Sequence, residues 1–184
     1  MEDPATAARR GENLLTEGRY AEAADAFLEA RALDPGSADL AFNLGLARLK
    51  DGRARDARVY LEEALALGSE EPDLLADLGL ALFELGRIDE AESRYRRALE
   101  LAPNHPEAAN NLGVIMFQSD RLDDALRYFN LAVQSRPDYY DAWFNLRDTC
   151  DELLTKLSGQ GNPSLLAQRE EAATRTRDLE GRRR

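Results

Sequence analysis

The chain has 184 residues, of which 43% are hydrophobic and 7% aromatic, and its formal net charge at pH 7 is −11. The hydrophobic content is enough for a packed core and excludes wholesale disorder, and the abundance of Ala, Leu, Glu and Arg favours an all-helical fold. The negative charge argues against binding to nucleic acid or to anionic membranes, and it favours a basic partner.

The sequence shows no export or membrane signal. The first residues, MEDPATAARRGENLL, contain no apolar segment of signal-peptide length. No apolar run approaches the ~20 residues that cross a bilayer. Cys150 is the only cysteine, so an intrachain disulfide is excluded. We therefore expect a cytoplasmic protein, and the Ala, Arg and Leu content hints at a bacterial source.

Small and large residues recur along the chain with a period of 34 residues. One glycine column is Gly11, Gly45, Gly79 and Gly113. An alanine column is Ala23, Ala57, Ala91 and Ala125. A second glycine column is Gly18, Gly52 and Gly86, and a proline column is Pro35, Pro103 and Pro137. A period of 34 residues over four copies predicts an array of two-helix repeats.

Each column has a physical role in such a helix pair. The first glycine column and the alanine column are small, which lets the two helices approach closely. The second glycine column lies in the turn between the helices, where glycine takes the left-handed conformation, and Asp120 replaces it in the fourth copy. The prolines end the second helices.

These columns, together with Trp143, resemble the tetratricopeptide repeat family. The resemblance implies an all-α fold, a right-handed superhelical array of antiparallel helix pairs (an α-solenoid). We expect an array over 4–157, divided into four full repeats, 4–37, 38–71, 72–105 and 106–139, and a fifth first helix at 140–157. A loop at 158–164, a C-terminal capping helix at 165–181 and a frayed tail at 182–184 should follow.

No catalytic or metal-binding constellation stands out in the sequence. His105 is the only histidine and falls in the turn sequence PNHP, which predicts a role in the turn or at the rim of a groove. Cys150 falls on the buried side of a predicted helix and is interpreted as a small core residue. The glycines are spread along the chain and form no phosphate-binding loop. We expect no enzyme activity, no metal and no cofactor.

In the family, the first helices line a concave groove that holds a peptide or a partner's helix. By similarity, one groove-facing column is Arg9, Asn43, Asp77, Asn111 and Asn145. It resembles the asparagine ladder of the repeat domain of O-linked N-acetylglucosamine transferase, in which the amides grip the main chain of an extended peptide. An amide can both donate and accept such hydrogen bonds. The alternative is that these amides only bond neighbouring helices.

A second column lies four residues earlier and consists of Ala5, Asp39, Asp73, Glu107 and Asp141. Its acidic members stand in first turns, so they either complement the helix dipole or form a negative rim that prefers ligands with Lys or Arg. Phe42 and Phe144, next to two asparagines, could add apolar pockets. The carboxylate clamp that the family uses for chaperone tails is rejected, because the corresponding positions are Asp or Asn rather than Lys or Arg.

The leading hypothesis is a non-enzymatic scaffold that binds an extended, basic peptide or partner segment in the concave groove. One alternative is a self-assembling subunit, because an unfinished fifth repeat would leave an apolar end and the C-terminal arginines could occupy an acidic groove. Such a chain could form a homo-oligomer through its C-terminal region. Another alternative is the targeting domain of a larger enzyme, such as a glycosyltransferase.

Overall fold

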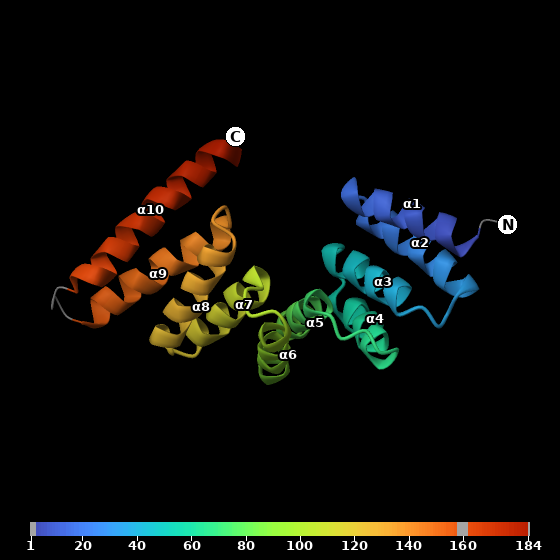
Figure 1. Cartoon of the computed structure of the whole chain (residues 1–184), viewed down its shortest axis with the longest axis horizontal. Helices are drawn as coiled ribbons and strands as arrows, with labels where there is room; N and C mark the ends of the chain where they lie inside the picture. The colour runs from blue at the N-terminus through green and yellow to red at the C-terminus, as the bar shows by residue number, and fades with distance from the viewer. Residues whose placement is uncertain (1–2, 158–161, 184) are drawn as a thin grey trace. The chain divides into compact units, whose positions relative to one another are not determined.

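The computed structural model describes residues 3–157 and 162–183, and every regular element in these ranges is an α-helix (Figure 1). The helices are α1 (Pro4–Thr16), α2 (Tyr20–Leu33), α3 (Ala38–Lys50), α4 (Ala54–Ala66), α5 (Pro72–Glu84), α6 (Ile88–Leu101), α7 (Pro106–Gln118), α8 (Leu122–Ser135), α9 (Tyr140–Lys156) and α10 (Pro163–Arg183). The chain forms two compact units, residues 1–101 and 102–184, which are described separately below.

The first unit contains three helix pairs, α1 with α2, α3 with α4 and α5 with α6. Between pairs, α2 packs on α3 and α4 packs on α5. Within each pair a three-residue turn reverses the chain, and its central glycine has a positive φ, as at Gly86 with 75°. In that turn the N–H of Arg87 donates to the carbonyl of Leu82 at 2.9 Å, which satisfies the end of α5.

In each helix pair of this unit, the glycine of the first column lies directly against a large side chain of the second helix. A Cβ built on Gly11, Gly45 or Gly79 would come within 2.6 to 2.7 Å of the side chain 16 residues later, which is a ring in two cases and Leu61 in the third. The alanine column is fully buried in the same interfaces. The core of each pair is therefore a close helix–helix contact that has no room for a methyl group at the glycine.

The second unit contains the pairs α7 with α8 and α9 with α10, and α8 packs on α9. The turn between α7 and α8 has Asp120 at the glycine position, with φ 60°. Gly113 repeats the close contact of the first unit, since its Cβ would lie 2.7 Å from the ring of Phe129. The same packing rule therefore operates in both units.

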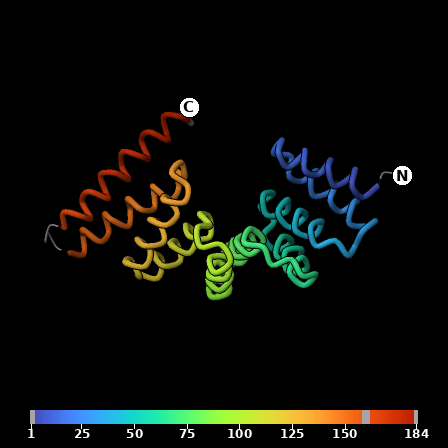
Figure 2. Tube along the Cα trace, in the orientation of Figure 1, coloured from blue at the N-terminus to red at the C-terminus, as the bar shows by residue number. Residues whose placement is uncertain are grey.

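Helix α10 runs alongside α9 and is its packing partner, as the Cα trace in Figure 2 shows. It buries Leu165, Ala172 and Thr176. The side chain of Asn162 accepts a hydrogen bond from the N–H of Leu165 at 3.1 Å and caps the first turn.

Helix α10 is longer than the capping helix expected over 165–181. It begins at Pro163, inside the expected loop 158–164, and continues to Arg183, inside the expected frayed tail. The Asn-Pro start explains the earlier beginning, because proline suits the first helical position. Residues 158–161 and Arg184 lie outside the described residues. In the described part, α9 is packed against α10 rather than left without a partner helix.

Candidate functional site

A hollow of about 400 Å³ lies between α1 and α3 of the first unit. It brings together three residues of the two predicted columns, Ala5, Asp39 and Asn43. Its walls also contain the carboxylates of Asp3, Glu12 and Asp34, together with Pro4, Ala8, Ser37 and Leu40. The described lining therefore holds four carboxylates, and none of its residues is Lys or Arg.

The carboxylates of this hollow differ in how they are engaged. Asp3 caps α1 by accepting hydrogen bonds from the main-chain N–H of Thr6 at 2.9 Å and from its hydroxyl at 2.8 Å. These hydrogen bonds lower the pKa of Asp3, so it stays ionised at neutral pH. Asp39 lies exposed in the first turn of α3 and makes no hydrogen bond or ion pair within the described residues. The hollow therefore presents negative charge to solvent.

The charge of the whole chain is concentrated in the first unit. Residues 1–101 contain 22 acidic and 13 basic side chains, which gives a formal net charge of −9. Residues 102–184 contain 13 acidic and 11 basic side chains, which gives −2. The excess of negative charge therefore lies mainly in the first unit.

The other predicted residues of the first unit lie outside this hollow. Phe42 is half-buried beside Asn43, and the Asn43 amide makes no hydrogen bond within the described residues. On α5, Asp73 is exposed and Asp77 is half-buried, and both take part in interactions of the fold.

In the second unit, three asparagines form a hydrogen-bonded chain that crosses from α7 to α9. Nδ2 of Asn145 donates to Oδ1 of Asn110 at 3.0 Å, and Nδ2 of Asn110 donates to Oδ1 of Asn111 at 3.2 Å. Asn111 and Asn145 are half-buried members of the predicted ladder, whereas Asn110 is buried. Of the two ladder amides, Asn145 is bonded across to α7, whereas Asn111 is bonded to Asn110 on its own helix, and each keeps further hydrogen-bonding capacity.

Sequence reasoning missed Asn110. Its repeat position is occupied by Ala8, Phe42, Ala76 and Phe144 in the other first helices. A single amide in a column of apolar residues is the signal that could have pointed to it, because a buried amide requires hydrogen-bond partners.

Glu107, a predicted acidic rim residue, forms an ion pair with Arg136. The guanidinium of Arg136 also lies 4.8 Å from the ring centroid of Tyr139. Burial raises the pKa of Tyr139 to about 12, and the negative charges of Glu107 and Asp141 add to the shift. Asp141 is exposed and makes no hydrogen bond or ion pair within the described residues. The rim of the second unit is therefore partly neutralised.

Phe144 is exposed over 38% of its surface but is not an open apolar pocket. The guanidinium of Arg147 lies 4.4 Å from its ring centroid, and the ring of Tyr140 lies 6.3 Å away at a tilt of 32°. Tyr140 in turn donates a hydrogen bond to Glu180 of α10 at 2.7 Å. Phe144 thus belongs to an aromatic and cationic cluster along α9.

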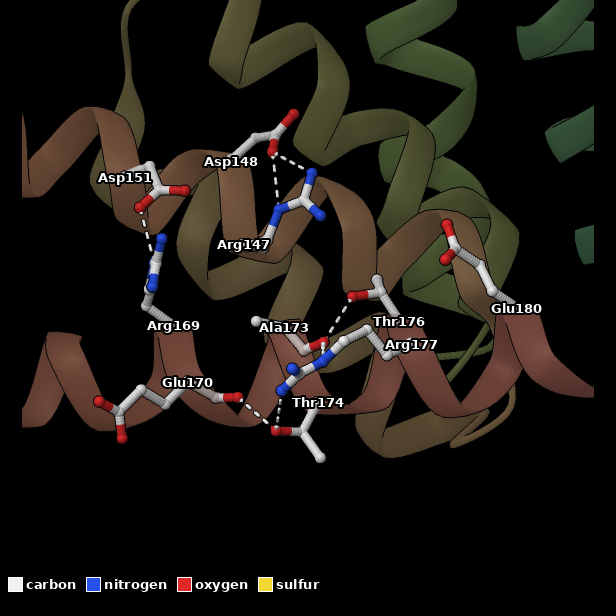
Figure 3. Close-up of a pocket in the computed structure, with 10 residues that line it drawn as sticks. All are labelled: Arg147, Asp148, Asp151, Arg169, Glu170, Ala173, Thr174, Thr176, Arg177 and Glu180. Atoms are coloured by element: carbon white, nitrogen blue, oxygen red, sulfur yellow. Dashed lines mark hydrogen bonds and ion pairs between the residues drawn. The ribbon is translucent and has the colours of Figure 1, made fainter.

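Arg147 stands at the repeat position that Gly11, Gly45, Gly79 and Gly113 occupy in the other pairs. Beside it, a surface cleft of about 680 Å³ is lined by residues of both α9 and α10 (Figure 3). Its described walls are charged: Arg147 pairs with Asp148 and Arg169 pairs with Asp151, both at 2.8 Å. The walls of this cleft are therefore polar, and self-assembly through the C-terminal end or the Arg-rich tail stays a prediction from the sequence.

His105 and Cys150, the residues of the sequence analysis that could carry chemistry, have structural roles in the fold. Nδ1 of His105 accepts a hydrogen bond from the N–H of Ala108 at 3.2 Å and caps α7. Burial raises the pKa of Cys150 to about 11, which keeps the thiol protonated at neutral pH. Among the described residues, no group of three or more His, Cys, Asp or Glu is arranged to hold a metal ion. None of the described helices combines the length and apolarity needed to cross a membrane.

A family model of the tetratricopeptide repeat matches residues 8–72 and 76–146, which is more than half of the chain. No curated protein matches this chain.

Solved structures with the same fold are numerous. MamA has a TM-score of 0.69 and 18% identity, covering 96% of this chain and 89% of its own. A MamA fragment from Desulfovibrio magneticus has a TM-score of 0.72 and 15% identity, with coverage of 97% and 93%. YrrB, described as a TPR protein with an unusual peptide-binding site, has a TM-score of 0.68 and 23% identity, with coverage of 96% and 86%. At these identities the likeness shows the fold alone.

Proposed function

Because the chain belongs to the tetratricopeptide repeat family, we propose that it is a non-enzymatic scaffold that binds an extended, basic segment of a partner protein on its first helices. The fold is shared with YrrB, a protein described as having a peptide-binding site, and this supports a peptide as the ligand. A cytoplasmic setting and a bacterial source stay predictions from the sequence.

One observation carries the proposal: the hollow between α1 and α3 gathers four carboxylates and the Asn43 amide without a basic residue in its described lining. A Lys or Arg side chain entering it would meet several negative charges at once. An exposed ion pair contributes only about 0.2–1 kcal/mol, so the selectivity comes from several pairs together and weakens with salt. The apolar wall of Pro4, Ala8 and Leu40 offers contact to the stem of such a side chain.

The second unit, taken by itself, offers hydrogen bonds to the main chain of an extended segment. Asn111 and Asn145 are half-buried and keep hydrogen-bonding groups beyond those used in the asparagine chain. Such hydrogen bonds do not depend on the side chains of the segment, so the preference for basic residues is argued from the hollow of the first unit alone.

The test uses a random array of 15-residue peptides probed with the wild-type chain and with Asp34→Asn/Asp39→Asn. The matched control is Asp89→Asn/Asp123→Asn, which removes two exposed carboxylates at the starts of α6 and α8, outside the hollow. We expect the wild type and the control to select peptides with Lys or Arg, and the hollow variant to lose this selection. The proposal fails if no peptide binds at several hundred micromolar, or if the hollow variant selects the same peptides as the wild type.

A further inference from the structure

The hydrogen bonds of Asn110 restrict the orientation of two amides that lie closer to solvent. Asn110 accepts from Asn145 on α9 and donates to Asn111, its neighbour on α7. Asn110 is only 5% exposed, so water has little access to replace either bond. Turning the Asn110 amide alone would place its NH2 against that of Asn145 and its oxygen against that of Asn111. Buried amides avoid such unpaired arrangements.

The orientation of Asn110 determines what its neighbours can offer to a ligand. An asparagine side chain has one carbonyl acceptor and an NH2 group with two donors. Oδ1 of Asn111 accepts a hydrogen bond from Asn110, and no described residue accepts a hydrogen bond from Nδ2 of Asn111. Nδ2 of Asn145 donates a hydrogen bond to Asn110, and no described residue donates a hydrogen bond to Oδ1 of Asn145. Asn111 therefore keeps its NH2 donor available, and Asn145 keeps its carbonyl acceptor available.

We infer that Asn110 is a positioning residue that gives this face a fixed polarity, with a hydrogen-bond donor at Asn111 and an acceptor at Asn145. This inference rests on the proposed function for its ligand, the main chain of an extended segment. Such a segment must place a carbonyl at Asn111 and a main-chain N–H at Asn145. The residue whose N–H meets Asn145 cannot be proline, because proline has no N–H. In the first unit, the equivalent neighbour of Asn43 is Phe42, which cannot orient an amide.

The first test measures hydrogen exchange of the side-chain amides by NMR in the full chain without any peptide. We expect the NH2 of Asn110 and Asn145 to exchange at least about fivefold more slowly than the NH2 of Asn111, because only the first two donate hydrogen bonds. Slow exchange at Asn111 with fast exchange at Asn145 would mean that the chain of bonds runs in the opposite direction. Equal exchange at all three would mean that Asn110 positions neither neighbour. Either result overturns the inference.

The second test uses a variant that should reverse which hydrogen-bonding group Asn111 exposes to a ligand. Asn110→Asp still accepts from Asn145 but has no NH2, so Asn111 should turn its own NH2 toward the new carboxylate and expose its oxygen. Exchange at the Asn111 NH2 should then slow to the rate seen at Asn145. Asn104→Asp is the matched control, since it makes the same change at an exposed turn residue of the same unit and should leave Asn111 unchanged. Fast exchange at Asn111 in Asn110→Asp would contradict the positioning role.

The third test reads the polarity through a peptide. The array peptide that binds the wild type most tightly is resynthesised with single amide-to-ester replacements, each of which removes one main-chain N–H. We expect one replacement to weaken binding to the wild type at least about fivefold, and a second position to become sensitive in Asn110→Asp. Identical ester profiles for the two proteins would overturn the inference. If no array peptide binds, the proposed function fails, while the exchange measurements still decide the role of Asn110.

Discussion

Gly79 on α5 lies so close to Tyr95 on α6 that a Cβ on the glycine would come within 2.6 Å of Cε1 of the ring. The Tyr95 ring is fully buried, so it has little freedom to move away. This contact explains why a glycine is kept inside a helix, where it costs about 1 kcal/mol relative to alanine. The same contact recurs between Gly113 and Phe129 in the second unit.

We predict that Gly79→Ala destabilises the protein despite its better helix propensity. Overpacking a tight interface costs about 1–3 kcal/mol, which exceeds the ~1 kcal/mol gained in propensity. Thermal unfolding should show a lower Tm for the variant. Gly181→Ala in α10 is the control, because its Cβ would meet nothing within 4 Å, and it should leave Tm unchanged or raise it. A Tm for Gly79→Ala at or above that of the wild type would refute the packing argument.

A second prediction concerns Arg48, which is 8% exposed on α3. Its guanidinium lies 3.5 Å from a carboxylate oxygen of Asp25 and 4.0 Å from one of Asp51. The same repeat position holds Leu14, Leu82, Met116 and Cys150 in the other first helices.

Arg48 is buried while the side chain of Asp25 is largely exposed, so the desolvation of the guanidinium is only partly offset by its ion pairs, and a well-packed apolar residue avoids that cost. Arg48→Leu should therefore unfold at the same or a higher urea concentration than the wild type. Arg48→Ala is the comparison, because it removes the charge and also leaves a cavity, and it should be less stable than Arg48→Leu. A strong destabilisation by Arg48→Leu would mean that the ion pairs stabilise the native state.

A third prediction concerns salt. If the carboxylates of the α1–α3 hollow bind Lys or Arg, peptide affinity should fall as ionic strength rises, because exposed charge pairs are screened within about 8–10 Å at physiological salt. The Kd of the selected array peptide should rise between low and physiological salt for the wild type. It should change less for Asp34→Asn/Asp39→Asn. Equal salt dependence in both proteins would place the basic contacts elsewhere.

A fourth prediction follows from the buried thiol of Cys150. Burial raises its pKa from 9.0 to about 11, so between these values the unfolded chain loses the thiol proton while the native chain keeps it. The native state then binds more protons than the unfolded state, and the free energy of unfolding falls as the pH rises from about 9 to 11. Cys150→Ala removes this contribution, so its Tm should decline less steeply over that range. Parallel Tm profiles for the two proteins would show that the thiol does not contribute.

The sequence by itself determined the helices, their pairing and the turns. The 34-residue period predicts the two-helix repeat. Within a repeat, the two helices meet through residues about 16 positions apart, such as Gly79 and Tyr95, so the pairing is visible in the residue pattern. Positive φ values at Gly86 and Asp120 follow from local backbone requirements. These features depend on neighbours along the chain, so the residue pattern carries them.

Only the tertiary structure decided which polar groups are already paired. The Asn145–Asn110 hydrogen bond and the Glu107–Arg136 ion pair join residues 35 and 29 positions apart, and their formation depends on side-chain conformations across neighbouring helices. The sequence placed Asn111, Asn145 and Glu107 in columns but could not tell an available amide or carboxylate from an engaged one. The position of each column residue is the same in every helix pair, because the fold repeats. The hydrogen-bond and ion-pair partners of these side chains differ from one pair to the next, so the repeat pattern does not predict them.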